Sequence, residues 1–263
     1  MSPHPGVKDQ RDVPSRAWAL AWCRPLRRDP SDHPACCIAL AEPPERPDLA
    51  IYSQEERLAQ GAPATWISPD INYNFTEVRA VVRNLSGRVS AVNAHVALCV
   101  SPFGLGTAQV MVGIQRLSFV PGQELRLVFP LPQALATSPG DNDFTNGNSG
   151  WHVRVEHPLD RQPINNRGSL VARGVFARDL APAARVSFPV RNDFASARRI
   201  DLGVTPNRLG ATVRPAARQF APGEQVDAEL TFDPALLVSG QEVSVVARAE
   251  GGAFVGGLTY LIM

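Results

Sequence analysis

The chain has 263 residues, 44% hydrophobic and 19% charged, which is enough apolar side chain for packed cores and too little charge for a disordered protein. Its 26 Lys and Arg nearly balance 25 Asp and Glu, and a net charge of +1 argues against binding to nucleic acid or to an acidic membrane surface. With 24 Pro and 20 Gly, the chain is interrupted too often for long helices, and the composition favours an all-β fold.

Residues 1–47 are rich in Pro, Arg and Asp and end in AEPPERP, so they are interpreted as an extended N-terminal arm and linker. The start has no apolar run of signal-peptide length, and nowhere do about 18 apolar residues follow one another. The cysteines show no zinc-binding spacing and are expected to be free thiols. We therefore expect a cytoplasmic protein, or one exported by a route without a classical signal peptide.

Within the arm, residues 17–22 read AWALAW, and Trp18, Leu20 and Trp22 recur at every second position. An extended strand would present these three side chains on one face, where they could bind a partner by adding a strand to an exposed sheet edge. The alternatives are that the arm packs on its own first domain or forms a short amphipathic helix.

A first domain is predicted over residues 48–160, because runs with apolar residues at every second position begin at Val78, Asn93, Leu125 and Trp151. Trp66 and Trp151 are predicted core residues. The polar, glycine-containing stretch 138–150 predicts a long surface loop.

This loop holds a candidate calcium site, because hard oxygen ligands recur there at Asp141, Asp143, Asn146 and Asn148. The EF-hand order is not reproduced, and a plain polar loop tip is the alternative.

A second copy of the pattern follows after a predicted linker at 161–169 and spans residues 170–263. Arg83-Asn84 recurs as Arg191-Asn192, and Pro121-Gly122 recurs as Pro222-Gly223. Each Pro-Gly fits the centre of a type II turn, where glycine takes a positive φ. The sequence thus predicts two tandem immunoglobulin-like β-sandwiches of about 100 residues each.

Four segments carry a resemblance to a known family: the opening PDLAIYS, WISPDI at Trp66, the strand ending in VRN, and the PGQE or PGE turn. Together they resemble CARDB-type immunoglobulin-like modules that are repeated in bacterial proteins. The resemblance implies a scaffold, adhesion or assembly module without an active site.

Possible catalytic groups do not form a recognisable constellation. Gly147-Asn148-Ser149-Gly150 is similar to the segment around a protease nucleophile, but Asn148 replaces the expected Asp and no histidine motif surrounds His95. His152 and Glu156 share a strand face, yet two ligands do not make a metal site. We predict no catalytic residues and no enzyme activity.

The predicted function is that of a structural or adaptor component of a multi-protein assembly, such as a sheath, fibre, baseplate or capsid-associated particle. Its partners would be other proteins or further copies of itself in an oligomer, and calcium is the only candidate cofactor. The alternatives are a ligand-binding module for carbohydrate or calcium using the 138–150 loop, and an accessory subunit of an enzyme encoded elsewhere.

Overall fold

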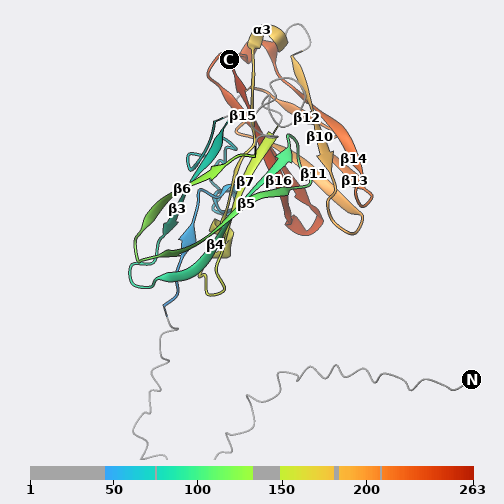
Figure 1. Ribbon diagram of the computed structural model, residues 1–263. Coiled ribbons are helices and arrows are strands. Elements are labelled where there is room, and N and C mark those ends of the chain that lie inside the picture. The colour runs from blue at the N-terminus through green and yellow to red at the C-terminus, as the bar shows by residue number, and fades with distance from the viewer. Residues whose placement is uncertain (1–44, 75, 133–148, 181–183, 208) are drawn as a thin grey trace, which may run out of the picture. The chain divides into compact units, whose positions relative to one another are not determined.

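The computed structural model describes residues 45–74, 76–132, 149–180, 184–207 and 209–263. These belong to one compact unit, Pro44–Met263, whose regular structure consists mostly of β-strands (Figure 1). The predicted all-β class is confirmed. Among the described residues, no helix is long and apolar enough to cross a membrane.

The first half of this unit is a sandwich of two antiparallel sheets. In one sheet β3 pairs with β1 and β2 on one side and with β6 on the other; the second sheet has the order β5-β4-β7-β8. Its elements are β1 (Leu49–Ala50), α1 (Gln54–Ala59), β2 (Ile71–Asn74), β3 (Glu77–Asn84), β4 (Ala91–Pro102), β5 (Val110–Phe119), β6 (Glu124–Pro130), β7 (Ser149–Glu156), η1 (Pro163–Asn165) and β8 (Arg167–Leu170).

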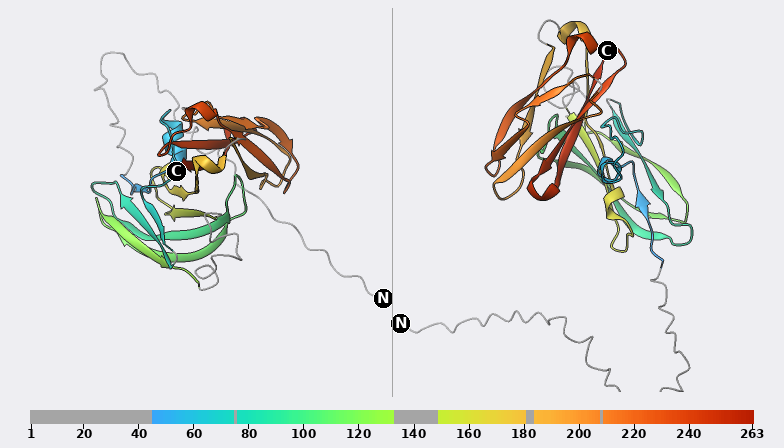
Figure 2. Two further views of the ribbon diagram at one scale, coloured as in Figure 1. Left: turned by 90° about the horizontal axis from the view of Figure 1, so that it is seen from above. Right: turned by 180° about the vertical axis from the view of Figure 1, so that it is seen from behind.

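The second half also has two sheets, in the orders β10-β14-β12 and β13-β11-β15-β16-β9. All pairs are antiparallel except β9 with β16. Its elements are β9 (Ala172–Val175), α3 (Ala177–Leu180), β10 (Arg185–Arg191), β11 (Arg198–Thr205), β12 (Thr212–Arg214), β13 (Ala217–Phe220), β14 (Gln225–Thr231), η2 (Pro234–Leu236), β15 (Glu242–Ala249), η3 (Glu250–Gly252) and β16 (Phe254–Ile262). Figure 2 shows these orange and red strands beside the blue-to-green strands of the first half.

Both halves pair their strands in the same way. The pairs β3–β6, β4–β7 and β7–β8 of the first half correspond in chain order to β10–β14, β11–β15 and β15–β16 of the second. An immunoglobulin sandwich joins its B and E strands in one sheet and its C, F and G strands in the other. The pairing observed here agrees with the immunoglobulin-like expectation.

The asparagines that mark the repeat have equivalent structural roles. Both are buried; Asn84 ends β3 and Asn192 directly follows β10. In each, Nδ2 donates to three backbone carbonyls, in the following turn and at the Pro-Gly turn. In those turns Gly122 and Gly223 have φ of 69° and 73°, which confirms the predicted positive values. One side chain therefore fixes two turns in each half.

Two of the segments quoted for the family resemblance contact each other. Asp70 of WISPDI is buried and accepts two hydrogen bonds from the Arg83 guanidinium of VRN, at 2.7 and 2.9 Å. Hydrogen bonding to Asp70 raises the pKa of Arg83, despite the opposing effect of burial, so the guanidinium stays charged in the fold.

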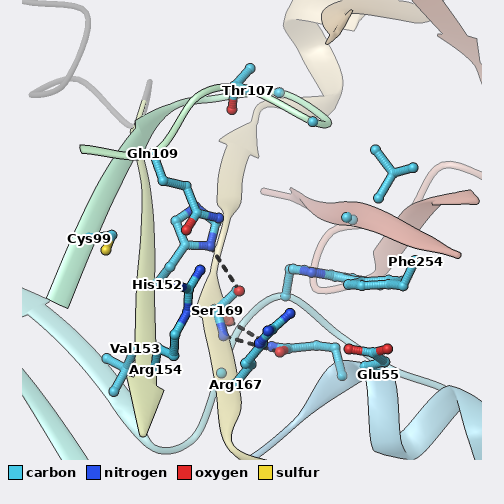
Figure 3. Close-up of a pocket in the computed structure, with 18 residues that line it drawn as sticks. Glu55, Cys99, Thr107, Gln109, His152, Val153, Arg154, Arg167, Ser169 and Phe254 are labelled. Carbon is cyan, nitrogen blue, oxygen red and sulfur yellow. Dashed lines mark hydrogen bonds between the residues drawn. The ribbon is translucent and has the colours of Figure 1, made fainter. Parts of the chain in front are cut away.

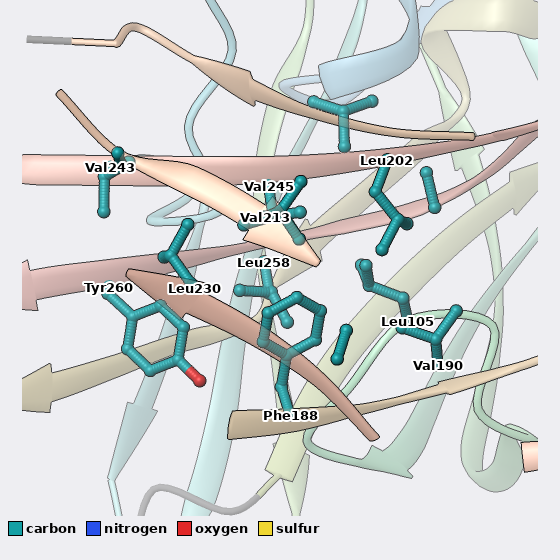
Figure 4. Close-up of a cluster of buried hydrophobic side chains, with 14 of the residues drawn as sticks. Leu105, Phe188, Val190, Leu202, Val213, Leu230, Val243, Val245, Leu258 and Tyr260 are labelled. Carbon is teal, nitrogen blue, oxygen red and sulfur yellow. The ribbon is translucent and has the colours of Figure 1, made fainter. Parts of the chain in front are cut away.

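The two halves are tied together because the first contributes side chains to the core of the second. Trp66, Phe103 and Leu105 pack in one cluster with Phe188 and Tyr260. Figure 4 shows Leu105 among the side chains of the second-half strands. The rest of the first half has a separate core that includes Trp151, as predicted. The second core is thus incomplete without residues from the first half.

The loop that carries Leu105 joins the edge of β10. Leu105 N donates to Pro189 O and Arg191 N donates to Leu105 O, both at 2.9 Å, which forms a one-residue parallel bridge to Val190. Gly106 has a φ of 64°, and a Cβ there would overlap the carbonyl of Arg191. A glycine is needed for this close approach.

Trp66 makes the second connection. Its indole lies against the backbone of Gly257 in β16, so closely that a Cβ on Gly257 would overlap the ring. Its backbone N donates to Thr259 Oγ1 at 2.8 Å, and its carbonyl accepts from Val171 N at 2.9 Å. These contacts anchor the first half on the central strands of the second.

The predicted linker 161–169 forms part of the first sandwich. It contains η1 and most of β8, whose residues pair with β7. The change from one half to the other occurs at Val171, between β8 and β9. The division into domains at 48–160 and 170–263 stays a prediction.

Replacing Gly257 by Ala should destabilise the protein, because the new methyl group must displace the buried Trp66 ring. We expect a loss of about 1–3 kcal/mol in the free energy of unfolding, the usual cost of overpacking. Gly203→Ala in β11 is the matched control, since a Cβ there meets nothing within 4 Å. Equal unfolding free energies for the two variants, measured in urea, would contradict this role of Trp66.

Candidate functional site

A cavity of about 150 Å³ lies between the two halves. Its walls come from α1, the β4–β5 loop, the outer faces of β4, β7 and β8, and the start of β16 (Figure 3). The polar side chains that line it include Glu55, Thr107, Gln109, His152, Arg154, Arg167 and Ser169, with Phe254 and Trp66 as aromatic neighbours. Because both halves supply the walls, the cavity depends on the contacts of Trp66 and Leu105.

Helix α1 is held to this wall by Gln54, a buried polar side chain. Gln54 Nε2 donates to Ser169 O at 2.6 Å, and Gln54 Oε1 accepts from Ser169 N at 3.1 Å. The amide thus pairs with both backbone groups of Ser169 as a neighbouring strand would. The same contact fixes the position of the Ser169 side chain beside His152.

His152 is held on both sides of its ring. Its Nε2 lies 2.9 Å from Ser101 Oγ and its Nδ1 lies 3.0 Å from Ser169 Oγ. Ser101 Oγ also donates to the carbonyl of Pro102, so we assign the ring proton to Nε2, with Ser169 donating to Nδ1. All three polar groups are then satisfied by a neutral imidazole.

The charged form of His152 is disfavoured in the fold. Burial, together with the nearby positive charge of Arg154, lowers its pKa from 6.5 to about 4. In the part of the chain that the structure describes, no carboxylate accepts from the ring. In a Ser-His-Asp triad the arrangement is different, because a carboxylate there stabilises the imidazolium that forms.

Arg154 and Arg167 lie directly opposite each other on β7 and β8, and both line the cavity. Arg154 is 3.8 Å from Glu156, and both of these side chains are largely exposed, so the pair is weak. Like charges on facing positions destabilise a sheet unless another group compensates them. The two guanidinium groups therefore make this part of the cavity suitable for an anion.

A second candidate site is the edge of the sheet formed by β5. Among the described residues, β5 pairs only with β4, so its other side is free. The strand is ten residues long and has one charged residue, Arg116. Val110, Met111 and Ile114 are 60%, 62% and 57% exposed. Proteins usually protect such edges with charges, prolines or short strands, so a long apolar edge indicates a binding surface.

Met111 and Ile114 lie on the outward face of the sheet, because they face Cys99 and Ala97 of β4 in the register. On the inward side β5 is close to β6, where Gln115 Nε2 donates to Val128 O at 2.7 Å. The outward side of the edge thus offers room for large apolar side chains, and the inward side is partly occupied.

The residues singled out from the sequence fall into two groups, those outside the described residues and those within them. Trp18, Leu20 and Trp22, and the calcium candidates Asp141, Asp143, Asn146 and Asn148, lie outside the described residues. Within the described ranges, no group of three or more His, Cys, Asp or Glu side chains could hold a metal ion.

His95 and Ser149 are far apart. On β4, His95 pairs with Glu156, whereas Ser149 pairs with Pro102, seven residues along the strand. At about 3.4 Å per residue the separation is about 24 Å, so the two residues cannot act together. The sequence placed His152 on the same strand face as Glu156. Its partners Ser101 and Ser169 were missed, because they come from two other strands.

No family model matches the chain, and no curated protein matches it in sequence. Among solved structures, the CupB2 chaperone of Pseudomonas aeruginosa is 11% identical over 34% of this chain and 51% of its own length, with a TM-score of 0.27. The periplasmic chaperone SfaE is 12% identical over 72% of this chain and 92% of its own, with a TM-score of 0.26. The match to the CupB2 chaperone covers about half of the length of that protein. Similarities this low carry no argument about function.

The low pKa of His152 predicts a loss of stability in acid. The unfolded chain binds a proton near pH 6.5 and the folded chain only near pH 4, so stability should fall between these values, by up to about 3 kcal/mol. His152→Gln keeps a hydrogen-bonding side chain that does not titrate, and its unfolding free energy should decline less over this window. Parallel curves for the two proteins in urea titrations from pH 7 to 4 would refute this assignment.

Proposed function

We propose that this chain is a non-enzymatic structural or adaptor component of a multi-protein assembly. In this role the two joined sandwiches act as a spacer and the edge of β5 is a protein-binding surface. The observation that supports it most is the exposure of Val110, Met111 and Ile114 on an edge strand, one side of which has no partner among the described residues. A sheet edge binds proteins through main-chain hydrogen bonds, and its apolar side chains add specificity.

The state of His152 also supports a role without catalysis. The imidazole is neutral, both ring nitrogens are engaged, and burial makes it a weak base. Within the described residues the Ser101–His152–Ser169 chain contains no carboxylate that would stabilise a protonated ring. The network therefore suits a fixed wall between the halves better than a general base.

The assembly that we propose is a sheath, fibre, baseplate or capsid-associated particle, built from protein partners or from further copies of this chain. It requires no nucleic acid, membrane or cofactor. The resemblance to CARDB-type modules points the same way, since such modules act as repeated scaffolds. A cytoplasmic location, or export without a classical signal peptide, belongs to the same proposal.

Purification from the native host tests this function. We expect the chain to elute within a large particle, and Met111→Lys with Ile114→Lys to release it, because two charges on the edge oppose strand pairing. Leu159→Lys with Val238→Lys is the matched control, since these side chains are 57% and 58% exposed on other surfaces. A native chain that elutes as a monomer would refute the proposal.

A ligand-binding module is the second candidate, favoured by the cavity where Arg154 faces Arg167. An anion that binds only the folded state must raise the melting temperature. Sulfate and calcium should be titrated separately, because calcium would report on the 138–150 loop instead. Sulfate should stabilise the unmodified chain but not Arg167→Gln; equal melting curves with and without sulfate would remove the cavity as an anion site.

A further inference from the structure

We propose that the edge of β5 binds residues 17–22 of a second copy of this chain, as an added strand. This inference rests on the proposed assembly function and names the partner of its binding surface. Two features that are otherwise unexplained would then complement each other: an apolar edge that has no partner among the described residues and an apolar segment in the sequence that precedes them.

The side chains of the segment match the outward side of the edge. In an extended segment, Trp18, Leu20 and Trp22 would lie on one face and three alanines on the other. The outward side of β5 presents Met111 and Ile114, and large side chains can cover them there.

The inward side is partly occupied by the contact of Gln115 with Val128, which favours small side chains there. Ala17, Ala19 and Ala21 meet this condition. In the added strand, the large side chains of the segment would therefore lie on the outward side of the edge, and its alanines on the inward side.

The arm joins the sandwich close to this edge. Asn84 accepts a hydrogen bond from Asp48 N through Oδ1 and donates to Val120 O, just beyond the end of β5, through Nδ2. Glu45, the first described residue, lies 3.9 Å from Arg88 in the neighbouring turn. The arm therefore begins at the C-terminal end of β5.

The tether between the segment and the sandwich is long enough for the exchange. Residues 23–44 make up this tether and, at up to about 3.3 Å each, could span about 70 Å. The ten residues of β5 extend over about 34 Å.

Five prolines in this tether, Pro25, Pro30, Pro34, Pro43 and Pro44, favour an extended chain over one that folds back. This composition favours binding to a neighbouring copy. Each copy would carry one donor segment and one acceptor edge, so the exchange can close into a dimer or continue along a fibre.

Complementation between two full-length variants tests the exchange. The donor variant, Trp18→Ala with Trp22→Ala, keeps its β5 edge; the acceptor variant, Met111→Lys with Ile114→Lys, keeps its arm. In sedimentation velocity we expect the unmodified chain to associate as concentration rises. Each variant alone should associate at least about tenfold more weakly. An equimolar mixture should form a one-to-one dimer.

Two controls address folding and specificity. Leu159→Lys with Val238→Lys, at exposed positions on other surfaces, should leave association unchanged. The lysine substitutions at β5 lie at exposed positions and should change the melting temperature little. In the mixture, the Trp emission of the acceptor variant should shift to shorter wavelength as its arm becomes buried.

A mixture that stays monomeric overturns the proposal, as does an unmodified chain that is monomeric at all concentrations. If the native particle keeps the donor variant but loses the acceptor variant, the proposed assembly function stands and a different protein occupies the edge. If it loses neither, both the edge and the arm are excluded as assembly contacts.

Discussion

The packing of Trp66 against Gly257 is the contact on which the arrangement of this molecule depends. It places an aromatic side chain of the first half, 1% exposed, inside the core of the second. Leu105 reinforces it through the bridge to β10. Since the walls of the cavity come from both halves, its geometry exists only while these contacts hold. Each contact uses a glycine, because the Trp66 ring lies too close to Gly257, and the Arg191 carbonyl too close to Gly106, for a side chain to fit there.

This coupling gives the remaining features a consistent interpretation. Thr259 joins the two halves by accepting a hydrogen bond from the backbone of Trp66, and Gln54 fixes α1 to β8 within the first half. His152 is kept neutral between two serines. These are the properties of a rigid wall, and they suit a spacer. In contrast, β5 stands apart from the contacts between the halves and presents apolar side chains outward, where a partner could bind without disturbing the core.

The sequence predicted much of the fold but little of the site. Alternation placed β3, β4, β6 and β7 within a few residues, and the repeated Asn and Pro-Gly residues marked turns that one side chain fixes in each half. Trp66 was correctly predicted as buried, but local sequence cannot say that its core belongs to the other half. The edge strand β5 was not predicted as a whole, because the register shift opposite Leu98 and Cys99 interrupts its alternation.

Calorimetry of the full chain tests most directly whether the two halves form one unit. Because the second core includes side chains from the first half, neither half should unfold alone, and we expect a single transition whose calorimetric and van't Hoff enthalpies agree. Two separate transitions, or a calorimetric enthalpy about twice the van't Hoff value, would show that the halves unfold independently and would contradict the coupling through Trp66 and Leu105.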